Sequence, residues 1–210
     1  MNRILFTFPG QGAQIPGMLH ELDRVISCKH WFDRAGDVLG ENVLTLDTAE
    51  ALGRTRAVQL CILIAGVACA DWLIREKSMP DFVSGLSIGA FPAAVTSGAL
   101  AFDDALRLVS LRGELMENAC PAGYGLSAIG GLPERSVREL VEAVHSPEHP
   151  VFVANLNAAD QFVIAGSDEA MRRVLELARE KGATRTDRLA VAVPSHCPLL
   201  GEASRILAGA

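Results

Sequence analysis

The sequence predicts an α/β protein in which a small α+β module is inserted into a larger α/β body. Before Tyr124, short apolar runs end in Gly- or Pro-rich turns and lead into helix-like segments, the pattern of strand-turn-helix units. From Tyr124 onward the pattern changes to β-α-β-β-α-β. The chain then passes through Pro194, Ser195 and His196 into another helix-like segment. The module is therefore expected to interrupt the body.

Composition narrows the class of protein. The chain has 210 residues, of which 50% are hydrophobic, so it can bury a sizeable core. A net charge of -6 argues against nucleic acid as a partner. The apolar run over 60–70 is too short to span a bilayer, and the N-terminus lacks a signal-peptide core, so no membrane is expected. The five cysteines have no C-x-x-C spacing, which favours a cytoplasmic protein.

The elements of the body follow from apolar runs, caps and turn residues. The Pro9-Gly10-Gln11-Gly12 turn ends the first strand, and Pro80 follows a long helix that is apolar nearly all round. The expected elements are a strand over 3–8, helical segments over 19–40 with a break at 27–30, a buried helix over 55–77, a strand over 81–85, a helix over 88–98, and a helix to about residue 119 with Asp103 as its N-cap.

The module has the element order of a ferredoxin-like fold. The expected elements are strands over 124–132, 150–157, 160–166 and 184–193, and helices over 133–144 and 167–182, the second with Ser167 as N-cap. We therefore assign 123–193 to the module, and 1–122 with 194–210 to the body. An inserted module normally returns the chain to its parent domain for more than one helix. The body is thus expected to lack its C-terminal part.

Ser87 is the first candidate for chemistry. It lies in Gly85-Leu86-Ser87-Ile88-Gly89, the G-x-S-x-G form of a nucleophile elbow. A serine hydroxyl needs a base to remove its proton and donors to hold the oxyanion that forms. An elbow exposes the hydroxyl and leaves the backbone N–H of Ile88 available as one such donor. The alternative is an ordinary tight turn.

Gln11 lies in a Gly-rich loop that follows the first strand. In open α/β sheets, ligands bind at the carboxyl ends of strands, and the backbone N–H groups of such a loop can hold an anion or oxyanion. The alternative is a plain turn. The third glycine of a dinucleotide-binding G-x-G-x-x-G motif is absent.

Arg112 shares a helix face with the apolar residues Leu108, Leu115 and Met116. A guanidinium on an apolar face needs a carboxylate or phosphate partner, and it can grip a carboxylate with two hydrogen bonds. The alternatives are a structural ion pair and an arginine whose head group reaches solvent.

His196 is the candidate base. Of five histidines, it alone follows an apolar strand and is framed by prolines, Pro194 and Pro198. No clear Asp or Glu completes a triad, so we expect a Ser-His dyad.

Five motifs carry a resemblance to a known family: FTFPGQGAQ, GLSIGAF, LRGELM, NLNAADQFVIAG and VPSHCPL. In this order and approximate spacing they resemble the malonyl-CoA:acyl-carrier-protein transacylases and the acyltransferase domains of fatty-acid and polyketide synthases. The resemblance covers nearly the whole chain. It implies an α/β-hydrolase-like acyltransferase body with a ferredoxin-like insert.

The resemblance also implies roles for individual residues. Ser87 would carry the acyl group, His196 would be the base, and Arg112 would pair with the malonyl carboxylate. The N–H groups of Gln11 and Ile88 would form the oxyanion hole. The other substrate-binding positions would be Gly10, Gly85, Leu86 and Asn157. No metal and no bound cofactor are expected: malonyl-CoA is the substrate, and the partner is an acyl carrier protein with a phosphopantetheine-type arm.

Two residues of the elbow depart from the family pattern. The usual elbow reads Gly-His-Ser-Leu-Gly-Glu, whereas this chain has Leu86 before the serine and Ala90 after the second glycine. In this respect it is most similar to the malonyl-transferase (epsilon) subunit of malonate decarboxylase, which uses that enzyme's own carrier subunit. The alternatives are a fatty-acid synthesis transacylase, a serine esterase or thioesterase, and a non-catalytic assembly subunit. Family members are longer, and their additional part includes a Gln or Asn that helps orient the histidine, so the group that orients His196 stays open.

Residues 171–190 carry a basic bias on an acidic protein. Arginines such as Arg172 and Arg173 outnumber the acidic residues there. This bias is consistent with steering of an acidic carrier, and equally with an ordinary solvated helix face.

Overall fold

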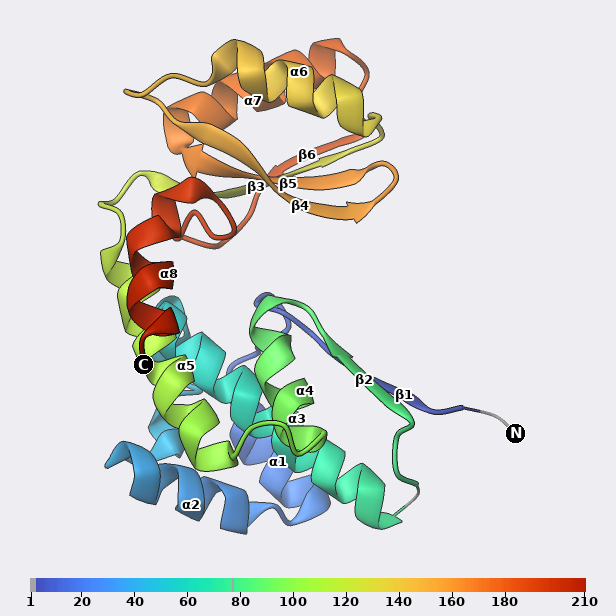
Figure 1. The fold of residues 1–210 in the computed structure, drawn as a ribbon, viewed down its shortest axis with the longest axis vertical. Helices are drawn as coiled ribbons and strands as arrows, with labels where there is room; N and C mark the ends of the chain where they lie inside the picture. The colour runs from blue at the N-terminus through green and yellow to red at the C-terminus, as the bar shows by residue number, and fades with distance from the viewer. Residues whose placement is uncertain (1–2, 77) are drawn as a thin grey trace. The chain divides into compact units, whose positions relative to one another are not determined.

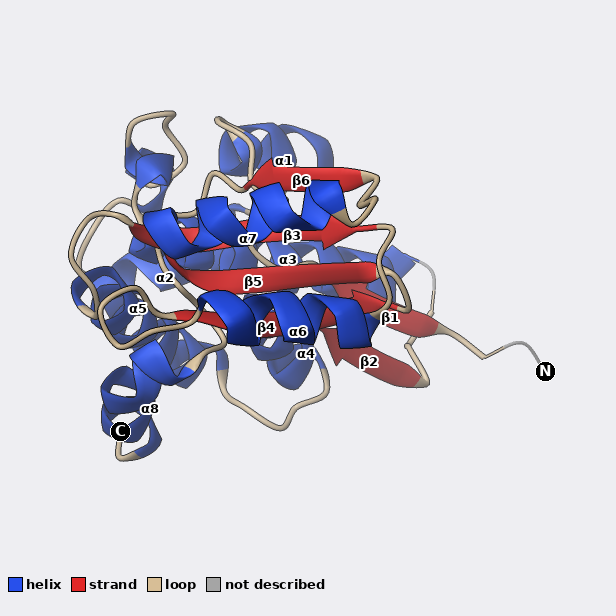
Figure 2. Cartoon of the chain, turned by 90° about the horizontal axis from the view of Figure 1, so that it is seen from above, coloured by secondary structure: helices blue, strands red, loops and turns tan. Residues whose placement is uncertain are grey.

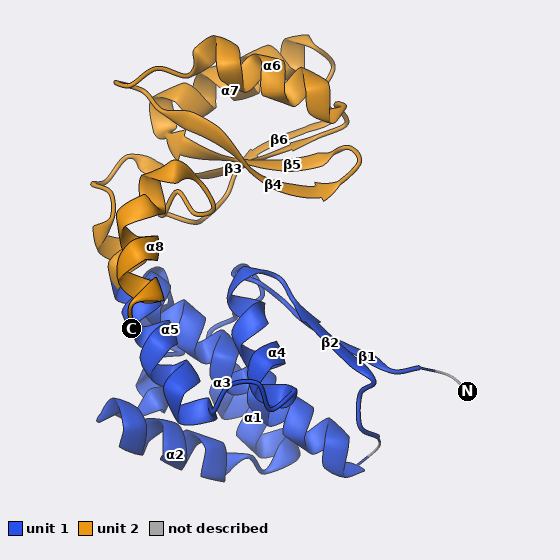
Figure 3. Cartoon of the chain, viewed as in Figure 1, with its two compact units in different colours: residues 1–114 blue, residues 115–210 orange. Residues whose placement is uncertain are grey.

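The computed structural model describes residues 3–76 and 78–210, which form two compact units, 1–114 and 115–210 (Figure 3). The division differs from the expected one. Residues 115–122 and 194–210, assigned from the sequence to the body, cluster with the second unit. The discontinuous body therefore stays a prediction, and each unit is described by itself.

The first unit is mainly helical, and its short parallel sheet lies at the edge of the helices (Figure 1). In chain order its helices and strands are β1 (Leu5–Phe8), α1 (Met18–Ile26), α2 (Lys29–Leu39), α3 (Thr55–Glu76), β2 (Phe82–Gly85), α4 (Ala90–Thr96) and α5 (Phe102–Asn118), the last of which crosses the boundary between the units.

Helix α3 forms the centre of the first unit. Its consecutive residues Leu60, Cys61, Ile62, Leu63 and Ile64 are all buried, because α3 has core neighbours on all sides. By length and composition alone, the whole helix could cross a membrane, although the apolar run over 60–70 is too short to do so. Most of the helix is buried inside the unit, as in the core helix of a soluble protein. The last residue of the helix expected over 55–77, Lys77, lies outside the described residues.

Strands β1 and β2 pair in parallel, with Leu5 opposite Phe82 and Phe8 opposite Gly85. Phe8 packs with Ala70 of α3 and Ala93 of α4. This pairing brings the carboxyl ends of both strands to the same edge of the sheet (Figure 1). The loop after β1 and the turn after β2 therefore begin side by side.

The second unit has the order β-α-β-β-α-β that the sequence indicates. Its elements are β3 (Tyr124–Gly130), α6 (Glu134–Val144), β4 (Val151–Ala158), β5 (Gln161–Ser167), α7 (Asp168–Glu180), β6 (Arg185–Arg188) and α8 (Gly201–Ala208). The four strands form an antiparallel sheet in the order β4-β5-β3-β6. Helices α6 and α7 cover one face of this sheet (Figure 2), and Ser167 caps α7 by accepting a hydrogen bond from the Ala170 N–H, as expected.

Three expected boundaries are wrong. The helix expected over 88–98 begins as a 3-10 turn over Ser87–Gly89 and becomes α-helical only at Ala90. Asp103 lies inside the first turn of α5, where its carboxylate accepts a hydrogen bond from Arg34 instead of capping the helix. The strand expected over 184–193 is only Arg185–Arg188, because the residue pairing with β3 ends at Arg188.

Candidate active site

The Ser87 turn has the strained backbone of a nucleophile elbow. Ser87 has φ +53°, in the left-handed region that non-glycine residues rarely occupy. It is the first residue of the 3-10 turn over Ser87–Gly89 that leads into α4, and only Leu86 separates it from β2. A left-handed residue between a strand and a helix turns the chain sharply and lifts its side chain out of the turn.

Two glycines make this turn possible. A Cβ on Gly85 would lie 2.1 Å from the Gly89 carbonyl, and a Cβ on Gly89 would lie 2.3 Å from the Phe8 carbonyl oxygen. Both contacts are with backbone, which cannot swing aside. The glycines of the motif are therefore required by close packing, within the elbow and between the elbow and the end of β1.

The Gln11 loop packs against the elbow. The Leu86 N–H donates to the Phe8 carbonyl at 3.0 Å, and a Cβ on Gly10 would lie 3.1 Å from the Leu86 carbonyl oxygen. Within residues 3–76 and 78–210, no hydrogen bond engages the backbone N–H of Gln11 or of Ile88. Both donors that the sequence singled out are thus available to an oxyanion.

Arg112 approaches Ser87 from α5. Its Nη2 donates to Ser87 Oγ at 3.2 Å. The side chain is partly buried, and burial alone lowers the pKa of the guanidinium from its usual range. Among the described residues, Arg112 has no ion pair with a carboxylate. The structural ion pair that the sequence left open is therefore not formed in this part of the chain.

Leu86 is the exposed apolar residue of the elbow. It is 54% exposed, although it directly precedes Ser87. Its side chain lies near Gly10, since a Cβ on Gly10 would be 3.4 Å from Leu86 Cγ. An apolar side chain therefore stands beside Ser87, where the family pattern has a histidine.

His196 and Asn157 lie in the second unit. His196 has φ +61° and is held in an irregular loop between β6 and a 3-10 turn over Pro198–Leu200. Asn157 sits at an irregularity of β4, where the pairing with β5 shifts between Leu156 and Ala158. The first unit thus brings together Gly10, Gln11, Gly85, Leu86, Ser87, Ile88 and Arg112.

Asp47 is a positioning residue that the sequence did not reveal. It is 1% exposed and accepts hydrogen bonds from the Leu19 N–H at 2.9 Å and from the His20 side chain at 3.0 Å. The Gly17 N–H donates to its backbone carbonyl at 2.8 Å. Asp47 therefore fixes the far end of the Gln11 loop at the start of α1. It stands in a stretch without periodic pattern, so no sequence signal marked it.

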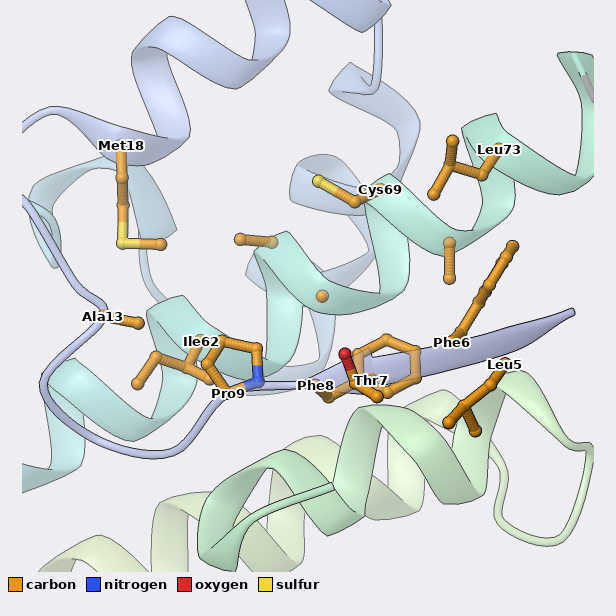
Figure 4. A pocket seen from close by; sticks show the side chains of 13 residues that line it. Leu5, Phe6, Thr7, Phe8, Pro9, Ala13, Met18, Ile62, Cys69 and Leu73 are labelled. Atoms are coloured by element: carbon orange, nitrogen blue, oxygen red, sulfur yellow. The ribbon is translucent and has the colours of Figure 1, made fainter. Parts of the chain in front are cut away.

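An apolar pocket of about 400 Å³ lies between β1 and α3 (Figure 4). The lining residues that Figure 4 labels include Phe6, Phe8, Ile62, Cys69 and Leu73. Burial raises the pKa of the Cys69 thiol, which makes it a poor nucleophile. The pocket therefore adds no group to the chemistry at Ser87. Across the described ranges, no cluster of three metal-ligating side chains occurs.

The first unit thus places a strained serine turn, two backbone N–H groups and an arginine side chain close together. The family model described as acyl transferase domain matches residues 5–208, so the chain belongs to this family. The malonyl CoA-acyl carrier protein transacylase of Bacillus subtilis is 37% identical over 99% of this chain and 67% of its own length. The chain thus spans about two thirds of that relative.

Solved structures agree with this assignment. The malonyl CoA-acyl carrier protein transacylase of Coxiella burnetii matches with a TM-score of 0.92 and 37% identity, over 99% of this chain and 67% of that one. A type II PKS acyl-carrier protein in complex with its malonyl-transacylase matches with a TM-score of 0.91 and 36% identity, over 99% of this chain and 69% of that one. The mixed α/β fold of the chain is that of these acyltransferases.

Proposed function

We propose that the chain transfers a malonyl group from malonyl-CoA to the thiol of an acyl carrier protein, through a malonyl ester on Ser87. The observation that carries this proposal is the contact between Arg112 and Ser87. A partly buried guanidinium lies 3.2 Å from the nucleophile without a carboxylate partner in the described chain. Such a cation is stabilised by a substrate that brings its own carboxylate, as malonyl does.

The proposed reaction has two symmetrical halves. His196 removes the Ser87 proton while Ser87 Oγ attacks the thioester carbonyl, and the N–H groups of Gln11 and Ile88 hold the oxyanion. The carbon–sulfur bond breaks, His196 returns the proton, and CoA leaves as the thiol. The carrier's phosphopantetheine thiol then attacks malonyl-Ser87 and the steps reverse, which gives ping-pong kinetics.

The remaining substrate contacts belong to the same proposal. Gly10 and Gly85 are substrate contacts on the resemblance alone, because Leu86 and Gly89 fill the space that a side chain would take at these two positions. Leu86 covers the ester with an apolar side chain. An apolar cover disfavours water relative to the carrier thiol, which a transferase requires. Arg112 distinguishes this site from that of an esterase, which has no use for a buried cation beside its acyl pocket. Asn157 is kept as a substrate contact on the resemblance alone.

The acceptor is proposed to be the carrier of fatty-acid or type II polyketide synthesis. None of the relatives described above is a malonate decarboxylase subunit, and their names fit the alternative transacylase better. The departures at Leu86 and Ala90 therefore do not outweigh the similarity of the whole chain. A cytoplasmic location is part of the proposal, supported by five cysteines that are all free.

The surface of α7 gives limited support to carrier docking. Arg172 forms ion pairs with Glu169 and Glu176, and Arg173 pairs with Glu176. These side chains are exposed, and their charges are already matched along the helix. The pairs favour an ordinary solvated helix face, so docking through Arg172 and Arg173 stays a prediction.

Intact mass spectrometry after brief mixing with malonyl-CoA tests the proposed function. We expect one malonyl adduct on the wild-type chain and none on Ser87→Ala. Ser84→Ala is the matched control, because Ser84 lies on β2 three residues before the nucleophile, and it should keep the adduct. A folded wild-type chain that forms no adduct would contradict the proposal. An adduct that survives in Ser87→Ala would assign the nucleophile to another residue.

A further inference from the structure

Arg188, the last residue of β6, uses its guanidinium to join three parts of the second unit. Its Nη1 donates to the Leu126 carbonyl and its Nη2 to the Tyr124 carbonyl, both on β3 and both at 3.0 Å. Its Nε donates to Asp168 Oδ1, at the start of α7, at 3.0 Å. Arg188 therefore connects the sheet to the helix that covers it.

The same guanidinium also holds the segment that leads to His196. Nη1 donates to the Leu189 carbonyl and to the Val191 carbonyl, the latter at 3.0 Å. No helix or strand is formed over 189–197 in the described chain, so a sheet ladder does not fix this segment. Its position depends instead on a few anchors, of which the Leu189 N–H to the Leu126 carbonyl, at 2.9 Å, is another.

The segment beyond these anchors is held by local hydrogen bonds on both sides of the histidine. Ser195 is buried, and its N–H donates to the Val193 carbonyl at 2.9 Å. The Cys197 thiol donates to the Pro194 carbonyl at 3.1 Å. Because these bonds tie neighbouring residues to one another, a displacement of the first residues of the segment also moves the last ones. The placement of His196 thus depends on where the chain leaves β6.

We infer that Arg188 is a positioning residue for the proposed base: by binding the carbonyls of Leu189 and Val191 to β3 and α7, it fixes the loop that presents His196. This inference rests on the proposed function, in which His196 is the base. Arg188 itself touches no reacting atom. Its effect on the reaction is carried wholly by the backbone of the loop.

The site is shaped for a guanidinium. A Cβ on Gly125 would lie 2.1 Å from Arg188 Nη2 and 2.4 Å from the Val191 carbonyl oxygen, so only glycine leaves room for the planar group. A guanidinium offers five N–H donors in a fixed plane, whereas a lysine offers three on one atom. Lysine at position 188 can keep the pair with Asp168 but cannot reach the carbonyls on both sides.

Arg188→Gln, with Arg185→Gln as matched control, tests the inference in the full chain. Arg185 is on the same strand and donates from Nε to Asp187, with no contact to the loop. Hydrogen exchange of 189–197 should quicken about tenfold or more in Arg188→Gln only, because charge-assisted hydrogen bonds are lost. Single-turnover acylation by malonyl-CoA should slow about tenfold to hundredfold at unchanged malonyl-CoA affinity, as for a misplaced group. Arg188→Lys should fall between.

Each outcome decides one step. Quicker exchange with an unchanged acylation rate would overturn the positioning role, and slower acylation without quicker exchange would overturn the anchor. If hydrogen exchange in Arg188→Gln rises throughout β3 and β5, the second unit has unfolded in that variant. The exchange of 189–197 and the acylation rate of Arg188→Lys then decide between the outcomes. A wild-type chain that is not acylated would contradict the proposed function, while the exchange comparison would still decide whether Arg188 anchors the loop.

Discussion

The Ser87 elbow of the first unit and the His196 loop of the second place a similar backbone strain in different surroundings. Ser87 has φ +53° and His196 has φ +61°. The elbow is held by backbone packed on backbone, at Gly85 and Gly89. The loop is held largely by the side chain of Arg188. Similar local strain can thus be stabilised by close packing in one region and by directed hydrogen bonds in another.

The difference determines which substitutions each region tolerates. Packing of backbone on backbone leaves no room for any side chain, so the elbow requires glycine at both Gly85 and Gly89. The loop requires hydrogen bonds from the Arg188 guanidinium, and a shorter or differently shaped donor preserves part of them. We therefore expect an all-or-none response at the elbow and a graded response at the loop.

Gly89→Ala should cause the largest loss of stability and of acylation. A small loss would contradict the idea that the elbow is fixed by close packing. The added Cβ would lie 2.3 Å from the Phe8 carbonyl oxygen and 2.6 Å from that of Pro9. Neither backbone atom can move without separating the Gln11 loop from the elbow. We expect a stability loss of at least about 3 kcal/mol, together with loss of the malonyl adduct. Thermal unfolding followed by circular dichroism and intact mass would measure both.

Gly53→Ala is the control for this change, because a Cβ at Gly53 meets nothing within 4 Å. It should leave both the melting temperature and the adduct close to those of the wild type. A Gly89→Ala variant that folds normally and still forms the adduct would show that the elbow is not fixed by packing at this position.

The elbow was easier to predict from the sequence than the His196 loop, because it is held by close packing. Close packing leaves a sequence signal, since glycines must flank Ser87, and the turn after β1 carries Pro9, Gly10 and Gly12. The anchor of the loop leaves none. Arg188 looks like any surface charge before an apolar run, and that run led to a strand being expected over 184–193, where β6 ends at Arg188.

Long-range contacts explain the other differences. Asp103 was expected to cap α5 from its place in the sequence, but it pairs with Arg34, which lies sixty-nine residues earlier in the chain. Asp47 organises the start of α1 from a segment without periodicity. The helices and strands of the second unit, by contrast, follow from local patterns such as the Ser167 cap. Sequence patterns report local propensity and close turns, whereas such polar partners are set by the tertiary fold.

Arg112→Ala should have the next largest effect on acylation. It separates the groups that shape the elbow from the group proposed to select its substrate. The shape of the elbow depends on glycines, but its choice of substrate is proposed to depend on this one side chain. Removing the guanidinium should cost about 2–5 kcal/mol of malonyl binding, or about 30-fold and more, with little loss for acetyl. Acylation rates with malonyl-CoA and acetyl-CoA, compared by single turnover, give the ratio.

Arg107→Ala is the matched control, since Arg107 lies on the same helix, is exposed and pairs with Asp104. It should keep the wild-type preference. Arg112→Lys should be intermediate, because an ammonium cannot grip a carboxylate with two parallel bonds. An unchanged malonyl-to-acetyl ratio in Arg112→Ala would remove Arg112 from the proposed mechanism.

Alkaline pH should produce the smallest loss of stability, and the loss should arise in the core of the first unit. Burial raises the pKa of Cys61 to about 12 and, with a contribution from Asp23, that of Cys28 to about 11, and both thiols lie in the first unit. These pKa values exceed those of the unfolded chain, so the stability they contribute is present below about pH 9 and lost as the pH rises towards the folded values. Between pH 9 and 10 each thiol should cost about 1 kcal/mol.

Fluorescence of Trp31 and Trp72, both in the first unit, measures this loss during thermal unfolding. The wild-type melting temperature should fall by about 2–4 °C for each thiol over that pH unit. Cys61→Ala should melt lower at pH 7, because it leaves a small void in the core, yet lose less between pH 9 and 10. The two proteins differ only at position 61, so the difference between their melting temperatures isolates the Cys61 thiol. If Cys61→Ala declined as steeply as the wild type, the alkaline sensitivity of the first unit would have to come from groups outside its core.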